Sequence, residues 1–226
     1  YAEYKDLLGN KLLHQNPAVW TIYHALDSDV PDAFQAYQAL RYIDNHIPHI
    51  PVKATGLCDD DLFLLSTTKW MPYTWSINDV AFAEVMHTAL AYWQAGRSEK
   101  AFKLWKSMLL ESMYLTSSPG NFQQLSFYDA FRGELYRDFS DSVAMAARTL
   151  TEGIFGIHPN LLEDKLVIQP GFPREWDHAS LAIDDISIQF KRHMNTDKYS
   201  IKPSYEKELK LILKLTAKTV LVENIL

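Results

Sequence analysis

The spacing of hydrophobic residues divides this chain of 226 residues into two parts. Up to about residue 158, hydrophobic residues recur three or four positions apart, which is the repeat of one face of a helix. Gly96 ends one such segment and Ser98 begins the next, so these two helices are expected to form an antiparallel hairpin. The stripes predicted to face the core are Ala36, Leu40, Ile43 and Ile47; Phe82, Val85, Met86, Ala89, Leu90 and Trp93; Phe102, Trp105, Met108 and Leu109; and Val143, Ala147, Leu150 and Ile154.

From residue 159 the repeat becomes two, which predicts β-strands. Hydrophobic and polar residues alternate over residues 186–191 and 209–216, and a short apolar run occupies residues 166–169. Residues 195–197 have the composition of a hairpin turn. The sequence therefore predicts a mainly α protein with two domains, helical hairpins over residues 1–158 and an antiparallel β domain over residues 159–226.

The ends of the chain also shape the expected organisation. The sequence starts at Tyr1 without a methionine, and it stops within a strand-like segment, residues 220–226. We therefore expect a piece of a longer protein, with the β domain truncated.

Composition narrows the class of partner. With 47% hydrophobic and 22% charged residues, the chain is expected to be globular rather than disordered. A net charge of −6 argues against nucleic acid as a partner. No apolar run approaches the roughly 20 residues that a membrane-spanning helix needs.

Motifs for cofactors and metals are absent from the sequence. No phosphate-binding glycine loop and no G-x-S-x-G or H-E-x-x-H motif occurs. The single cysteine, Cys58, excludes an intrachain disulfide and a cysteine-based zinc site. The acidic clusters at residues 27–29 and 59–61 lack the spacing of an EF-hand loop. We therefore expect neither a cofactor nor a metal.

The remaining candidates for chemistry are carboxylates close to aromatic residues. Glycoside hydrolysis needs two carboxyl groups across a cleft, and aromatic rings stack on sugar rings. Glu134 is the first candidate for a base that activates water, and Asp138 is the second. The candidate substrate-binding residues are Trp70, Tyr73, Trp75, Tyr128 and Arg132.

Several acidic residues of the chain also have a purely structural interpretation. Glu134 can instead form an ion pair with Arg132 or Arg137. Asp79 and Asp141 stand where helices are expected to begin, so capping is the simpler role for both.

Residues 153–176 resemble the end of the six-hairpin (α/α)6-barrel glycosidases. In those families the last barrel helix leads through a G-I-x-P turn to a strand, a proline-rich segment with a tryptophan, and a C-terminal antiparallel sheet. The matching residues here are Gly153-Ile-Phe-Gly-Ile-His-Pro-Asn160, the run from Lys165 to Gln169, and Pro170, Pro173 and Trp176. α-Rhamnosidase-like enzymes and maltose- and cellobiose-phosphorylase-like enzymes share this ending. Residues 20–37 resemble a branch of this group found among polysaccharide-degrading proteins of gut Bacteroidetes.

The resemblance implies the C-terminal part of an (α/α)6 toroid followed by an antiparallel β-sandwich-like sheet. It implies a glycoside hydrolase-like protein, or a fragment of one, that acts on a poly- or oligosaccharide through carboxylate acid–base chemistry. The general acid of those families lies N-terminal to this chain or near its start. A periplasmic or extracellular location in a bacterium is favoured.

Other functions stay open beside this one. A phosphorylase is less expected, because no evident phosphate-binding cluster of His, Ser and Gly is present. The main alternative is a non-catalytic carbohydrate-binding or scaffold protein on the same fold, and a lyase or an epimerase is a further possibility. The oligomeric state is left open.

Overall fold

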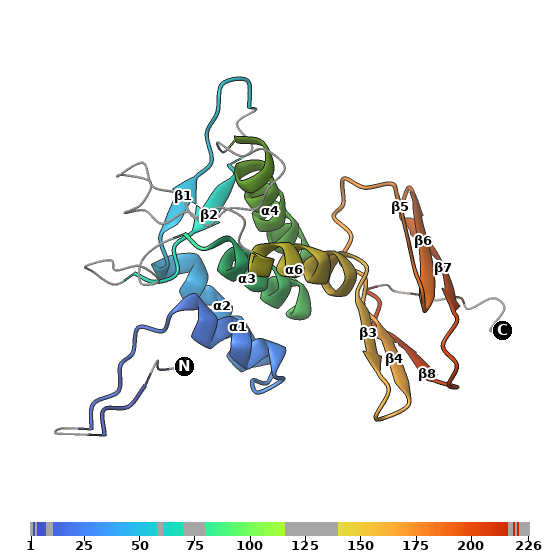
Figure 1. The fold of residues 1–226 in the computed structure, drawn as a ribbon, viewed down its shortest axis with the longest axis horizontal. Coiled ribbons are helices and arrows are strands. Elements are labelled where there is room, and N and C mark those ends of the chain that lie inside the picture. Colours follow the sequence, from blue (N-terminus) through green and yellow to red (C-terminus); the bar gives the residue numbers. More distant parts are fainter. Residues whose placement is uncertain are drawn as a thin grey trace. The chain divides into compact units, whose positions relative to one another are not determined.

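The fold is known from a computed structural model that describes residues 2, 4–7, 11–57, 61–69, 80–115, 140–216, 219 and 221. The chain forms two compact units, Tyr1–Gly153 and Ile154–Leu226, which are described separately. Figure 1 shows the elements of each unit.

The described part of the first unit contains five α-helices and one small sheet. Two of the helices run on into π-helical segments, η1 (Leu110–Leu115) after α4 and η2 (Thr149–Ile154) after α6. Strands β1 (His49–Pro51) and β2 (Phe63–Leu65) pair antiparallel. The helices are α1 (Val19–Asp27), α2 (Ala33–His46), α3 (Phe82–Gln94), α4 (Ser98–Leu109) and α6 (Ser140–Arg148).

Helix α3 is the centre of this unit and packs against α1, α4 and α6 (Figure 1). All six residues of its predicted stripe are buried, and so are further residues on its other faces. A helix that is apolar around most of its surface is stable only when neighbours cover it on several sides. Segment η2 comes especially close, since a Cβ atom on Gly153 would lie 2.5 Å from the ring of Trp93.

Helix α2 begins with a capping box. The Asp32 carboxylate accepts a hydrogen bond from the backbone N–H of Gln35 at 2.8 Å, and the Gln35 side chain accepts one from the backbone N–H of Asp32 at 3.1 Å. These bonds satisfy two N–H groups that a helix start otherwise leaves unpaired.

The described residues of the second unit form two three-stranded sheets. In one sheet, β3 (Ile157–Asn160) pairs antiparallel with β4 (Lys165–Ile168), which pairs parallel with β8 (Lys210–Leu213). The other sheet is an antiparallel meander of β5 (His178–Ile183), β6 (Ile186–His193) and β7 (Thr196–Pro203).

The inward face of β6 supplies the core of the second unit. Ile186, Ile188 and Phe190 alternate along the strand and are buried, as the two-residue repeat predicts. The ring of Phe190 stacks on that of Phe172, with 4.3 Å between the centroids. The turn to β7 lies at residues 194–195, slightly earlier than the turn composition predicts.

The predicted fold class, a mainly α partial (α/α)6 toroid with an antiparallel β-sandwich-like sheet, is wrong. Helices account for 39% of the described residues, and strands, in three small sheets, account for 25%. Strands β1 and β2 have three residues each, which is too short for a two-residue repeat to be recognised. The pairing of β8 with β4 is parallel rather than antiparallel.

Of the stripe predicted to face the core in this segment, Ile154 is buried, but Val143 and Ala147, the two members within helix α6, are exposed. Val143 is 52% exposed, whereas Ser142, Met145 and Thr149 are buried. The Thr149 hydroxyl donates to the backbone oxygen of Met145 at 2.8 Å and accepts from Trp105 Nε1 at 3.1 Å. Buried hydroxyl groups that are hydrogen-bonded in this way can occupy core positions, and a count of hydrophobic residues alone does not detect them.

Candidate functional site

All seven site residues predicted from the sequence lie outside the described residues. The two candidate catalytic carboxylates are Glu134 and Asp138, and the candidate substrate-binding residues are Trp70, Tyr73, Trp75, Tyr128 and Arg132. Their roles therefore stay predictions.

A group of titratable side chains lies where α1, α3 and α6 pack together. Within α1, Asp27 follows Tyr23 by four positions and His24 by three, and the members from α3 and α6 are spaced by three and by seven positions. We call this group the α1–α3–α6 cluster. Its members are Tyr23, His24 and Asp27 of α1, Glu84 and His87 of α3, and Asp141 and Arg148 of α6.

Glu84 and Tyr23 form the buried end of the cluster. Tyr23 is 4% exposed, and its hydroxyl donates a hydrogen bond to the Glu84 carboxylate. Burial is the main reason that the pKa of Glu84 is raised, and the charge of Asp141 raises it further, against the hydrogen bond from Tyr23 and the influence of His24. Burial and the nearby charge of Glu84 also raise the pKa of Tyr23, so Tyr23 stays a hydrogen-bond donor. A carboxyl group that keeps its proton above the usual pH range can act as a general acid.

His87 is held neutral beside this pair. Its ring stacks on that of Tyr23, with 4.5 Å between the centroids and 8° between the planes. Burial, followed by the positive charges of Arg148 and His24, lowers the pKa of His87 to about 4. A neutral imidazole can both donate and accept a hydrogen bond at pH 7.

Asp27 and Arg148 form the other end of the cluster. The guanidinium of Arg148 donates to both carboxylate oxygens of Asp27, at 2.8 and 2.6 Å, and Gln94 donates to Asp27 at 2.9 Å. Burial acts to raise the pKa of Asp27, but the hydrogen bonds from Arg148 and Gln94 outweigh it and lower this pKa. Arg148 also pairs with Glu152 at 2.9 Å. The pair of hydrogen bonds from Arg148 to Asp27, called the fork below, connects α1 to α6 and keeps Asp27 ionised, so that it carries a proton poorly.

Asp141 connects the start of α6 to the buried end of the cluster. It is exposed, and its carboxylate accepts a hydrogen bond from the backbone N–H of Ser142 at 2.7 Å. An acidic residue in the first turn also interacts favourably with the helix dipole. Its charge acts on both Glu84 and Tyr23. The structural role expected from the sequence and a place near candidate chemistry therefore coincide at this residue.

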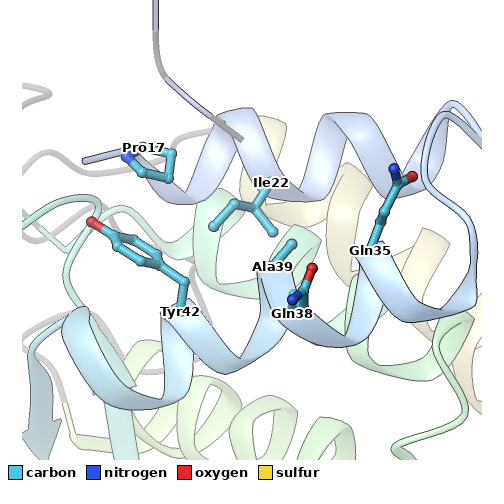
Figure 2. Close-up of a pocket in the computed structure, with 6 residues that line it drawn as sticks. All are labelled: Pro17, Ile22, Gln35, Gln38, Ala39 and Tyr42. Atoms are coloured by element: carbon cyan, nitrogen blue, oxygen red, sulfur yellow. The ribbon is translucent and has the colours of Figure 1, made fainter. Parts of the chain in front are cut away.

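A second feature of the first unit is a pocket of about 370 Å³ between α1 and α2. Figure 2 shows its six lining residues, which come from α2, from α1 and from the segment before α1. They are Pro17, Ile22, Gln35, Gln38, Ala39 and Tyr42.

A scan against models of known protein families finds no match, and a comparison with curated proteins finds none either. Within the described ranges, no group of three or more His, Cys, Asp or Glu residues is arranged to hold a metal ion. No helix in that part of the chain is long and apolar enough to cross a membrane. The function is therefore argued from the chemistry of the site.

The sequence carried a signal for this cluster that hydrophobic spacing did not use. Glu84 and His87 are ionisable residues inside α3, whose neighbouring positions are almost all buried. Charged residues are seldom buried without a partner, so their presence within a buried helix points to a specific environment.

Proposed function

We propose that this chain takes part in the hydrolysis of O-glycosyl bonds in a poly- or oligosaccharide, with Glu84 as the proton donor. The observation that carries this proposal is a half-buried carboxyl group whose pKa is raised by burial and, to a smaller extent, by the charge of a second carboxylate, Asp141. Glycoside hydrolysis needs two carboxyl groups, one that donates a proton and one that acts as base or nucleophile. The resemblance of residues 153–176 to glycosidases supports the same reaction.

The proton of Glu84 would pass to the glycosidic oxygen as the bond to the sugar breaks. Tyr23 acts as a positioning residue, because its hydroxyl holds the carboxyl group through a hydrogen bond. Asp141, in the first turn of α6, is a candidate for the carboxylate that activates water or attacks the sugar. Glu134 and Asp138, which precede α6 in the sequence, remain candidates for the same role.

The test compares Glu84→Gln with the parent on glycosides whose leaving groups differ in acidity. On alkyl glycosides, we expect kcat to fall by about 10²–10⁴-fold, because the departing alkoxide oxygen needs a proton. On 2,4-dinitrophenyl glycosides we expect kcat to fall much less, because that leaving group departs as a stable anion. Glu99→Gln, the same change at an exposed position of α4, should leave both rates unchanged.

The dependence on the leaving group separates the possible roles. An equal loss on both classes of substrate would make Glu84 a structural residue and contradict its role as the acid. Sugar binding by the parent without any hydrolysis would favour the alternative function, a non-catalytic carbohydrate-binding protein.

A further inference from the structure

The pocket between α1 and α2 has a buried apolar floor and a polar rim. Pro17, Ile22 and Ala39 are buried, whereas Gln35 and Gln38 are exposed. Figure 2 shows Pro17 and Tyr42 at one end of the pocket and Gln35 at the other end. None of the six lining residues carries a charge.

This lining favours an uncharged ligand with several hydroxyl groups. An ionic group would lose hydration in the pocket, and none of its described lining residues carries a charge to compensate for that loss. The amides of Gln35 and Gln38 can donate and accept hydrogen bonds, which suits hydroxyl groups. The volume of about 370 Å³ is near the lower end of small-ligand pockets, about 300–1,000 Å³, so the ligand is small.

Two lining residues are held in place before any ligand arrives. The Gln35 side-chain oxygen accepts the backbone N–H of Asp32, so its amide nitrogen is the group left to donate. The Tyr42 ring contacts that of His46, with 5.0 Å between the centroids, and Lys69 Nζ lies 5.5 Å from its centre. Side chains that are already ordered lose less entropy when a ligand binds.

We propose that the α1–α2 pocket binds a single neutral, polyhydroxylated ring, such as one sugar residue. The neutral, hydroxylated character follows from the lining, and the identification as a sugar rests on the proposed function. The pocket is lined by residues of α1, of α2 and of the segment before α1, whereas the cluster is formed by α1, α3 and α6, so the two share no residue.

The test is ligand-observed saturation-transfer NMR with the methyl glycosides of glucose, galactose, mannose and rhamnose. It is run on the Glu84→Gln chain, so that hydrolysis does not consume the probe. We expect at least one of these neutral glycosides to bind, and methyl glucuronide, which is anionic, to bind more weakly. Absence of binding by all four, or tighter binding of the glucuronide, would overturn the proposal.

Two variants assign the binding to this pocket. Gln38→Leu removes an exposed amide and should weaken binding about 2- to 12-fold, the usual range for one lost hydrogen bond. Tyr42→Leu removes the flat ring and should weaken binding independently. Gln189→Leu, the same change as Gln38→Leu on an exposed position of β6, is the matched control and should bind as the parent does.

The outcomes for the pocket and for the proposed function are distinct. If Gln38→Leu and Tyr42→Leu both bind as tightly as the parent, the pocket proposal is wrong, whatever the activity of Glu84→Gln. If Glu84→Gln keeps full turnover but both pocket variants lose binding, the proposed acid is wrong and the pocket stands. Circular dichroism melting of each variant checks that the loss of binding does not come from unfolding.

Discussion

Glu84 and Asp27 are two acidic residues of the same cluster, and their environments shift their pKa values in opposite directions. Burial acts on both carboxyl groups to raise their pKa values. Glu84 receives a hydrogen bond from the uncharged Tyr23, which does not overcome the effect of burial. Asp27 receives two hydrogen bonds from the cation Arg148 and one from Gln94, and its pKa falls.

This difference shows that the hydrogen-bond partner, together with the depth of burial, decides what a carboxyl group can do. A cation holds a carboxylate ionised and turns it into a clamp between helices. A phenol leaves the carboxyl group able to hold a proton. In one cluster, α1 and α6 are thereby joined at Asp27, and a proton donor is kept at Glu84.

The largest expected effect comes from removing the cation with Arg148→Leu. Asp27 would lose its fork, and we expect the free energy of unfolding at pH 7 to fall by about 1–3 kcal/mol. Because the folded pKa of Asp27 is lowered, its contribution is present above the unfolded value of 3.8 and is lost as pH falls through the folded pKa. The deficit of the variant should therefore shrink in acid, as measured by urea unfolding at pH 7 and pH 3.

The control for this change is Arg41→Leu, at an exposed position of α2. It should cost little stability at either pH. If Arg148→Leu lowers the free energy of unfolding equally at both pH values, the stabilisation does not depend on the charge of Asp27.

A smaller effect is expected from Tyr23→Phe at the other end of the cluster. The change removes one hydrogen bond, worth about 1 kcal/mol. Since that bond lowers the pKa of Glu84, its loss should raise this pKa further. For a general acid, the fall of kcat/KM at alkaline pH should then move to higher pH. Tyr37→Phe, the same change at an exposed position, should leave the profile in place, and a shift toward lower pH in Tyr23→Phe would contradict the assignment.

Asp141→Asn should act in the opposite direction. Asp141 raises the pKa of Glu84, so its neutral replacement should lower this pKa and move the alkaline fall of kcat/KM to lower pH. Stability should drop by about 0.3–1 kcal/mol through the weakened start of α6. The pKa of Glu84 can be measured directly by carboxyl ¹³C NMR, with Asp184→Asn, at an exposed turn, as the control. An unchanged pKa would show that Asp141 does not act on Glu84.

The smallest expected effect is the influence of Glu84→Gln on stability. Because the folded pKa of Glu84 is raised, the parent gains stability in acid and loses it as pH rises from the unfolded value of 4.5 through the folded pKa. The variant lacks this loss. Its unfolding free energy relative to the parent should therefore increase between pH 4 and pH 8, and a constant difference would contradict the raised pKa.

Hydrophobic spacing predicted some elements of the fold well and others poorly. All six stripe residues of α3 are buried, and so are Ile186, Ile188 and Phe190 of β6, because these segments repeat over several turns or residue pairs. The buried face of α6 and η2 is not the predicted one, because the hydroxyl residues Ser142 and Thr149 occupy core positions. Strands β1 and β2 are not predicted, because each has only three residues and an alternation of hydrophobic and polar positions cannot be recognised over so short a segment.

The candidate site was harder to predict than the fold. Asp141 was recognised, but only as one of several acidic residues near an expected helix start. The contact between Glu84 and Tyr23 joins positions far apart in sequence, and nothing in the spacing of either helix predicts it. The opposite pKa shifts of Glu84 and Asp27 depend on these distant partners, so they follow only from the three-dimensional arrangement.

The parallel pairing of β8 with β4 has a consequence for the order in which the second unit assembles. The meander β5–β6–β7 lies entirely within the chain that connects these two paired strands. Pairing β8 with β4 closes a long loop, and the loss of conformational entropy is larger than for the short turns of the meander. The meander can therefore form early, and β8 pairs with β4 afterwards. During synthesis on the ribosome, β8 can therefore pair with β4 only after the whole meander has been made.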